Sequence, residues 1–187
     1  MAVHRVAQLG HPAIRSKAIP VLDSEIGTQE LKTLVADLTD TMRDYGGVGI
    51  AAPQIRVSKR LFVIEVRDSA RYRNAEPFPL TVVLNPSLAN AGTEQTTEWE
   101  GCLSIEGLRG RVPRATDVLL NGLDAEGAPL KLELQGFPAI VAQHELDHLN
   151  GLVYLDRMTS MSSLTFLEEF ERYHRPQAPE RPPDGSG

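Results

Sequence analysis

Cysteine is almost absent from this chain. Cys102 is the only cysteine among 187 residues, so no disulfide can form within the chain. No apolar run reaches the length of about 18 residues that a transmembrane helix needs. The first residues, MAVHRVAQLGHPAIR, lack the apolar stretch and the cleavage site of a secretory signal. These absences together predict a protein of the reducing cytoplasm that does not enter a membrane.

Basic clusters are lacking as well. The formal net charge is −6, and no group of five or more lysines and arginines occurs. Direct nucleic-acid binding is not expected, because contact with phosphates needs a positive surface. The length and the 41% of hydrophobic residues are ordinary for one globular domain. We expect residues 1–175 to form a single catalytic domain and the Pro-rich, polar residues 176–187 to be a disordered tail.

Apolar residues recur at both helical and strand-like spacings. Residues 23–45 are predicted to form an amphipathic helix that Asp23 or Ser24 caps. Further helices are expected over 138–151 and 160–174. Four short runs predict strands, over 60–66, 80–85, 117–123 and 130–134. Because helices and strands do not alternate regularly, we expect an α+β fold, with mixed or antiparallel strands around the 138–151 helix.

That central helix carries the sequence QHELDH at 143–148. Residues four apart lie on one face of a helix, so the imidazoles of His144 and His148 can bind one cation, although two such histidines can also be ordinary core residues. Glu145 is rotated around the helix, where it can contact a water at the metal. The pattern also occurs in zinc peptidases. However, the chain after His148 has no histidine until His174 and lacks the metzincin continuation.

Two upstream segments are ambiguous when each is taken alone. WEGCLS at 99–104 contains Cys102, and an isolated thiol in a reducing compartment is more often an inert buried side chain than a ligand. GVGIAAPQ at 47–54 ends at Gln54. It lacks the lysine and the following serine or threonine of a phosphate-binding loop. A glycine-rich turn after a helix is common.

In this order, GVGIAAPQ, EGCLS and QHELDH resemble the three motifs of the peptide deformylase family, over about residues 4–158. The resemblance implies a hydrolase that acts in protein biosynthesis. It would remove the formyl group from N-formyl-methionyl nascent polypeptides through a metal-activated water, with release of formate. The implied metal ligands are Cys102, His144 and His148. Fe(II) is the implied ion, and the donors are also compatible with Zn, Ni or Co.

The resemblance also implies catalytic roles. Glu145 would act as general base and then as acid, while the Gln54 side-chain amide and the Leu103 backbone N–H would donate to the oxyanion. Arg109 is predicted to contact the peptide backbone, and Arg114 is expected to pair with Glu100. Helical periodicity and the first motif predict a pocket for the methionine side chain, formed by Val48, Gly49, Phe137, Ile140 and Val141. Plain core packing is an equal alternative for Phe137 and a weaker one for Val141.

Two other functions stay open from the sequence. A metallopeptidase would take its third ligand from downstream of His148 and would not need Cys102. A non-catalytic module would use the metal as a structural cross-link, which calls for a closed site with four ligands, whereas three strong ligands are visible. The nascent peptide is the expected partner, and contact with the ribosome exit is the further expectation.

Overall fold

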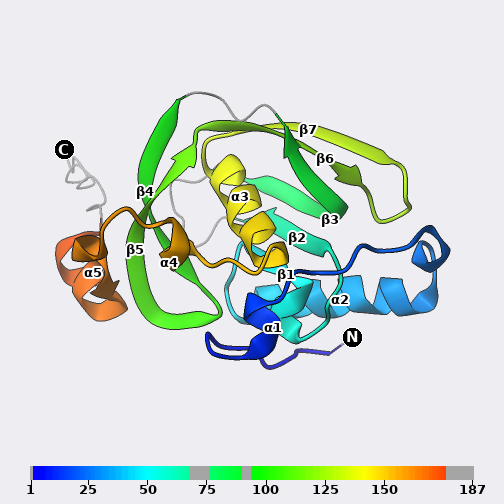
Figure 1. Ribbon diagram of the computed structural model, residues 1–187, viewed down its shortest axis with the longest axis horizontal. Helices are drawn as coiled ribbons and strands as arrows, with labels where there is room; N and C mark the ends of the chain where they lie inside the picture. Colours follow the sequence, from blue (N-terminus) through cyan, green and yellow to red (C-terminus); the bar gives the residue numbers. More distant parts are fainter. Residues whose placement is uncertain (1, 68–75, 90–93, 176–187) are drawn as a thin grey trace, which may run out of the picture.

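The computed structural model describes residues 2–67, 76–89 and 94–175 (Figure 1). The helices are α1 (Pro12–Arg15), α2 (Gln29–Asp44), α3 (Phe137–Leu149), α4 (Tyr154–Arg157) and α5 (Leu167–Tyr173). Short 3-10 turns are η1 (Asp23–Glu25), η2 (Ala52–Ile55) and η3 (Met161–Ser163). The strands are β1 (Gly49–Ala51), β2 (Leu61–Val66), β3 (Phe78–Ala89), β4 (Gln95–Cys102), β5 (Ile105–Ala115), β6 (Asp117–Leu123), β7 (Pro129–Gln135) and β8 (Thr165–Phe166). Among the described helices, none is both long and apolar enough to cross a membrane.

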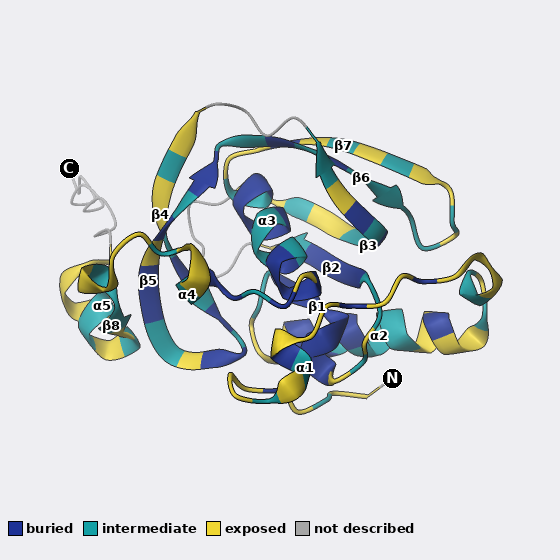
Figure 2. Cartoon of the chain, in the orientation of Figure 1, coloured by how far each residue is buried: buried dark blue, intermediate teal, exposed yellow. Residues whose placement is uncertain are grey.

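The larger sheet has five strands in the order β1-β2-β3-β6-β7, and every neighbouring pair is antiparallel. Successive side chains of a strand point to opposite faces. On β2, Phe62 and Ile64 therefore join the apolar cluster beneath α3, while Leu61 and Val63 join the cluster that contains α2. Figure 2 shows β2 and α3 as largely buried. The sheet thus packs between two helices, and α3 lies near the centre of the molecule.

The smaller sheet has the order β4-β5-β8. Strands β4 and β5 form an antiparallel hairpin in which Glu100 pairs with Gly110 and Cys102 pairs with Ile105. Neither strand is among those expected from the sequence. Threonine, glycine and charged residues interrupt any apolar alternation over 94–101, and glycine and arginine do so over 105–115. A third apolar cluster, which includes Cys102, Val112 and Tyr154, lies between this hairpin and the α4 region.

The α+β prediction with antiparallel strands around the histidine-bearing helix is confirmed, and the four predicted strands are present with small shifts of their ends. The prediction for the first helix is wrong at its start. Gly27 adopts a φ of +78°, which breaks the helix, and Asp23 and Ser24 lie in the separate turn η1. The true cap is Thr28, whose hydroxyl accepts the Leu31 N–H at 3.3 Å.

The prediction of a helix over 160–174 is wrong in its first half. Residues 161–163 form the turn η3, and Phe166 pairs with Leu108 as part of β8, so α5 begins only at Leu167. Backbone pairing with the edge of β5 thus replaces the first helical turns. The predicted tail, 176–187, lies outside the described residues, and the domain limit at residue 175 stays a prediction.

Candidate metal centre and active site

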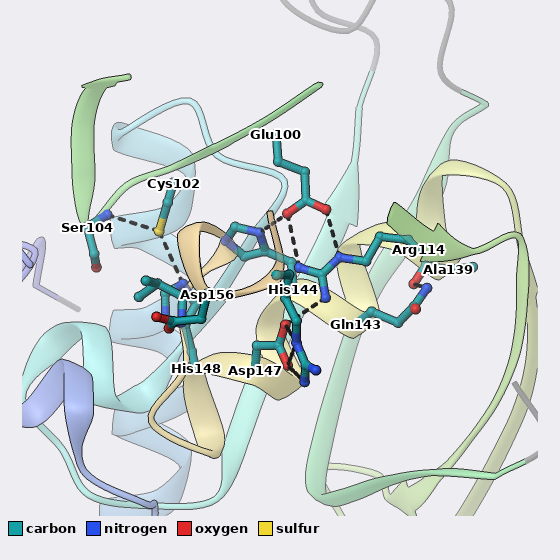
Figure 3. A network of polar contacts seen from close by, with 12 residues as sticks. Glu100, Cys102, Ser104, Arg114, Ala139, Gln143, His144, Asp147, His148 and Asp156 are labelled. Atoms are coloured by element: carbon teal, nitrogen blue, oxygen red, sulfur yellow. Dashed lines mark hydrogen bonds and ion pairs between the residues drawn. The ribbon is translucent and has the colours of Figure 1, made fainter. Parts of the chain in front are cut away.

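The two histidines of α3 and the cysteine at the end of β4 meet between the two sheets (Figure 3). One ligand atom from each of Cys102, His144 and His148 lies within 4.8 Å of the other two. The Cys102 Sγ atom is 3.1 Å from Nε2 of His148, and the two imidazole centroids are 5.0 Å apart. The spacing of four residues on a helix therefore gives the geometry that the sequence predicted, with the sulfur arriving from a distant strand.

The charges of this cluster suit a divalent cation. Burial alone would raise the pKa of the Cys102 thiol, but His148 and His144 outweigh burial and hold that pKa well below its usual range. A thiolate with two imidazoles is a donor set typical of Zn, Fe(II), Ni or Co. In the described part of the chain, the group contains these three ligands and no fourth. This arrangement resembles an open catalytic site rather than a closed structural one.

The third candidate metal ligand is thus Cys102. Among the described residues, no side chain from downstream of His148 belongs to this group. This finding removes the main support for the metallopeptidase alternative, which needed such a ligand.

The side chain of Gln54 is held in one orientation. Its Oε1 accepts the Ala51 N–H at 2.8 Å, so its Nε2 points the other way, 3.2 Å from the Ser104 hydroxyl and 3.8 Å from the Cys102 sulfur. The residue is 1% exposed. Because its acceptor atom is already engaged by the backbone, the amide presents N–H groups toward the candidate metal centre.

The turn that contains Leu103 is held from both sides. The Ser104 N–H donates to the Cys102 sulfur at 3.3 Å, and the Gln8 side chain donates to the Leu103 carbonyl at 3.0 Å. The Leu9 N–H also donates to the Ser104 carbonyl at 2.8 Å. The sequence analysis gave no role to Gln8 or to Ser104, the last residue of EGCLS, because their partners are close only in the folded chain.

Glu145 is almost completely buried, with an exposed fraction of 4%, and its Oε2 atom has no hydrogen-bond partner in the described residues. Burial raises the pKa of Glu145 to about 7. A carboxyl group with a pKa near neutrality can both accept and return a proton. The carboxylate packs directly on the backbone of Gly49, where a Cβ atom would lie 2.9 Å from both Cγ and Cδ of Glu145 and closer still to Oε1. Any larger residue at position 49 would collide with this carboxylate, which explains why position 49 is a glycine.

A second close approach explains the glycine of EGCLS. A Cβ atom on Gly101 would lie 2.8 Å from Nε of Arg109 and closer to the rest of the guanidinium group. Arg109 is 9% exposed and donates to the Leu108 carbonyl at 2.8 Å. Its guanidinium group therefore lies against the residue that precedes Cys102.

The residues predicted to hold the methionine side chain have mixed surroundings. Val141 belongs to the apolar cluster beneath α3, and Val48 and Phe137 are partly buried against that cluster. Ile140 is buried, with 7% exposed, and Gly49 is buried beside Glu145. The core-packing alternative stays open for both Phe137 and Val141, since both pack at this cluster. Their part in substrate binding stays a prediction.

The expected pair between Arg114 and Glu100 is present. Arg114 Nε donates to Glu100 Oε1 at 2.7 Å, and Arg114 Nη2 donates to Oε2 at 3.1 Å. The same carboxylate lies 2.7 Å from Nδ1 of His144. Although burial opposes ionisation, His144 and Arg114 lower the pKa of Glu100 to about 2. A histidine ligand whose second nitrogen is held by a carboxylate is common in metal sites, because this contact orients the ring.

Comparison with known proteins agrees with this geometry. The sequence model of the family described as "Polypeptide deformylase" matches residues 3–163. Peptide deformylase 1 of Nitrosomonas europaea is 44% identical over 156 residues, which cover 83% of this chain and 88% of that relative. Peptide deformylase 2 of Pseudomonas syringae pv. tomato is 38% identical over 178 residues, which cover 95% of this chain and 99% of that relative.

Solved structures give the same result. A class I type b peptide deformylase from Acinetobacter baumannii with Met-Ala-Ser bound superposes with a TM-score of 0.82 at 37% identity, covering 84% of this chain and 99% of that chain. The peptide deformylase from Thermotoga maritima superposes with a TM-score of 0.75 at 31% identity, covering 86% and 100%. With a family match over most of its length and the motif residues gathered at one site, this chain belongs to the peptide deformylase family.

Proposed function

We propose that this chain hydrolyses the formamide bond of formyl-methionyl polypeptides, releasing formate and a free α-amine, at a site built from Cys102, His144 and His148. The relatives that are 38% and 44% identical over most of their length support the reaction. The single observation that carries the site is the meeting of these three side chains beside the buried carboxylate of Glu145.

The three ligands would hold one divalent ion, and we propose Fe(II) as the physiological one, with Zn, Ni or Co compatible with the same donors. When bound, such an ion supplies a Lewis acid for the formyl oxygen and brings the pKa of a water molecule from 15.7 toward about 7. The lowered pKa of the Cys102 thiol supports this assignment, since the thiolate is the form that binds a metal.

Glu145 would move the proton. Its carboxylate accepts a proton from the attacking water and returns it to the nitrogen that leaves as the new α-amine. The pKa of about 7 suits both directions at neutral pH. The packing of Glu145 on Gly49 keeps the carboxylate in one place beside His144.

Gln54 and Leu103 would stabilise the charge that develops on the formyl oxygen. The Gln54 amide presents its N–H groups toward the site because its oxygen is held by Ala51, and the Leu103 N–H would be the second donor. Donors fixed before the reaction cost no reorganisation, and loss of one typically lowers the rate by about 10²- to 10³-fold.

The peptide would lie along the outer edge of β1. This strand is the terminal one of the larger sheet, so its second edge has no strand partner among the described residues. An extended peptide can add to such an edge through backbone hydrogen bonds. The A. baumannii structure with Met-Ala-Ser bound supports a peptide ligand of this kind. Arg109 would contact the peptide backbone, and the methionine side chain would occupy the pocket of Val48, Gly49, Phe137, Ile140 and Val141.

We also propose that the enzyme works in the cytoplasm on nascent chains at the ribosome exit. The single thiol and the bacterial relatives support the location. The net charge of −6 gives no support for direct contact with RNA.

The experiment that tests the proposal compares Glu145→Ala with the unaltered protein. Formate release from a formyl-methionyl tripeptide should fall by about 10²- to 10⁴-fold, while the bound metal, measured by elemental analysis, should stay the same because Glu145 is not a ligand. Glu168→Ala, on the exposed surface of α5, is the matched control and should change neither value. If the unaltered, metal-loaded protein released no formate, the proposal would be wrong.

A further inference from the structure

A series of charged side chains connects His144 to the surface of the molecule. It begins at the imidazole, whose Nδ1 lies 2.7 Å from Oε2 of Glu100. Both oxygens of Glu100 accept hydrogen bonds from Arg114, so the carboxylate is an acceptor and the His144 ring nitrogen is the donor, which leaves Nε2 as the ligand atom for the group with Cys102 and His148. The orientation of this ligand therefore depends on the position of the Glu100 carboxylate.

Glu100 is itself held by Arg114. Figure 3 shows Glu100 between His144 and Arg114, with Asp147 on the far side of the guanidinium group. Arg114 donates two hydrogen bonds to the Glu100 carboxylate. Its remaining nitrogen, Nη1, donates to Asp147 Oδ2 at 2.6 Å. The Arg114 side chain is 4% exposed, and those of Glu100 and Asp147 are 5% exposed. One buried cation thus serves two buried anions.

Arg157 supplies the second cation. It lies at the end of α4, and its guanidinium group donates to both oxygens of Asp147, with Nη2 at 2.6 Å from Oδ1 and Nε at 3.1 Å from Oδ2. Its side chain is 47% exposed, so the series ends at solvent. With Arg157, two carboxylates face two guanidinium groups. Without it, Arg114 alone would have to balance both acids, and an unbalanced buried charge is costly.

We propose that Arg157 is a positioning residue for the metal site: by pairing with Asp147 it leaves Arg114 to hold Glu100, and Glu100 in turn orients His144. The proposal rests on the metal site proposed above. Asp147 lies three residues after His144 on α3, so the same helix carries both His144 and the carboxylate that Arg157 contacts. When Arg157 is lost, Arg114 is drawn toward Asp147, its grip on Glu100 weakens, and the imidazole gains freedom to rotate.

The test is the affinity for Zn(II), measured on the metal-free protein by competition with a chromophoric chelator. Loss of a residue that directly contacts a metal ligand typically costs 10- to 100-fold in affinity. Because Arg157 is three contacts further out than Glu100, we expect Arg157→Gln to weaken Zn(II) binding by about threefold to tenfold. Arg157→Lys keeps the charge but loses the paired contact with both oxygens of Asp147, so it should recover only part of the lost affinity.

Arg15→Gln is the matched control. Arg15 pairs with Asp156, the neighbour of Arg157 on α4, and its side chain is 44% exposed, but it does not belong to the series that reaches His144. Because the Arg15–Asp156 pair is exposed on both sides, Arg15→Gln should lower the melting temperature of the metal-free protein less than Arg157→Gln, and it should leave Zn(II) affinity unchanged.

Unchanged Zn(II) affinity in Arg157→Gln would overturn the proposal, and so would an equal loss in Arg15→Gln, since the effect would then be a general loosening of α4. If the unaltered chain bound no Zn(II), the proposed metal site would itself be wrong, and the role of Arg157 with it. The formate assay does not enter these measurements, so the two proposals can fail separately.

Discussion

Replacement of Gly49 by alanine would place a methyl group where Glu145 packs. The new Cβ would lie 2.9 Å from Cγ and from Cδ of Glu145, and closer to Oε1. Carbon atoms in unstrained contact are about 3.5–4.0 Å apart, so the carboxylate must move by about 1 Å. Glu145 is 4% exposed and has little free space. Gly49 itself does not have a positive φ, so the backbone accepts alanine and the collision is the main effect.

A displacement of this size has a known cost. Misplacement of a catalytic group by about 1 Å lowers the rate by about 100-fold, which corresponds to about 2.7 kcal/mol of transition-state free energy. We therefore expect kcat for formate release from a formyl-methionyl peptide to fall by about 100-fold in Gly49→Ala. The metal content should not change, because the three atoms nearest to the new methyl group all belong to Glu145, which is not a ligand. Crowding should also lower the free energy of unfolding by about 1–3 kcal/mol.

A double-mutant cycle identifies the cause. In a Glu145→Ala background the carboxylate is gone, and Gly49→Ala should change the residual rate by less than about threefold. The reasoning is refuted if Gly49→Ala alone keeps most of the activity of the unaltered enzyme. It is also refuted if the two changes multiply, since the methyl group would then act through another contact.

Three further predictions follow from other contacts. Gly101→Ala should displace the guanidinium group of Arg109 and raise KM for a formyl-methionyl peptide about tenfold, the cost of one charge-assisted hydrogen bond; a kcat/KM left unchanged by Arg109→Ala would contradict this role. Removal of the metal by a chelator should lower the melting temperature, because an ion at 1,000 times its Kd stabilises the folded state by about 4 kcal/mol; calorimetry that shows equal melting with and without metal would be evidence against the site. The hydrogen bonds from Arg43 lower the pKa of Glu65, so this pair stabilises the fold above the unfolded pKa of about 4.3 and stops doing so as pH falls through the folded value. Arg43→Gln should therefore cost about 0.5–1 kcal/mol of unfolding free energy in urea at pH 7, and the difference should shrink below pH 4; a constant difference would contradict the assignment.

The parts of the fold that could be predicted are those decided by near neighbours in the sequence. The spacing of His144 and His148 predicted a shared face because a helix fixes that geometry locally. The leucine-rich strands were predictable for a similar reason. Strands β4 and β5 were not, since their pairing joins residues such as Glu100 and Gly110 whose side chains show no apolar alternation. The start of α2 depended on one positive φ at Gly27, which apolar periodicity does not reveal.

In the candidate site, too, the residues set by local sequence could be predicted, and those set by tertiary packing could not. Cys102 became a credible ligand only when three motifs were considered together, because the strand that carries it is far from α3 in the sequence. The contacts of Gln8 and Arg157 had no sequence signal at all. Each depends on where a distant segment packs, and tertiary packing is the information that local patterns lack.

The ligands come from a strand of the smaller sheet and from a helix that packs on the larger sheet, and this origin has a mechanical consequence. The sulfur moves with the β4–β5 hairpin, whereas both imidazoles move with the helix that packs on the larger sheet. Any motion that separates the hairpin from the helix would also separate the ligand atoms. Release of a bound ion and separation of these two parts of the fold would therefore be coupled. A bound ion would therefore link the β4–β5 hairpin to the larger sheet as well as take part in the reaction.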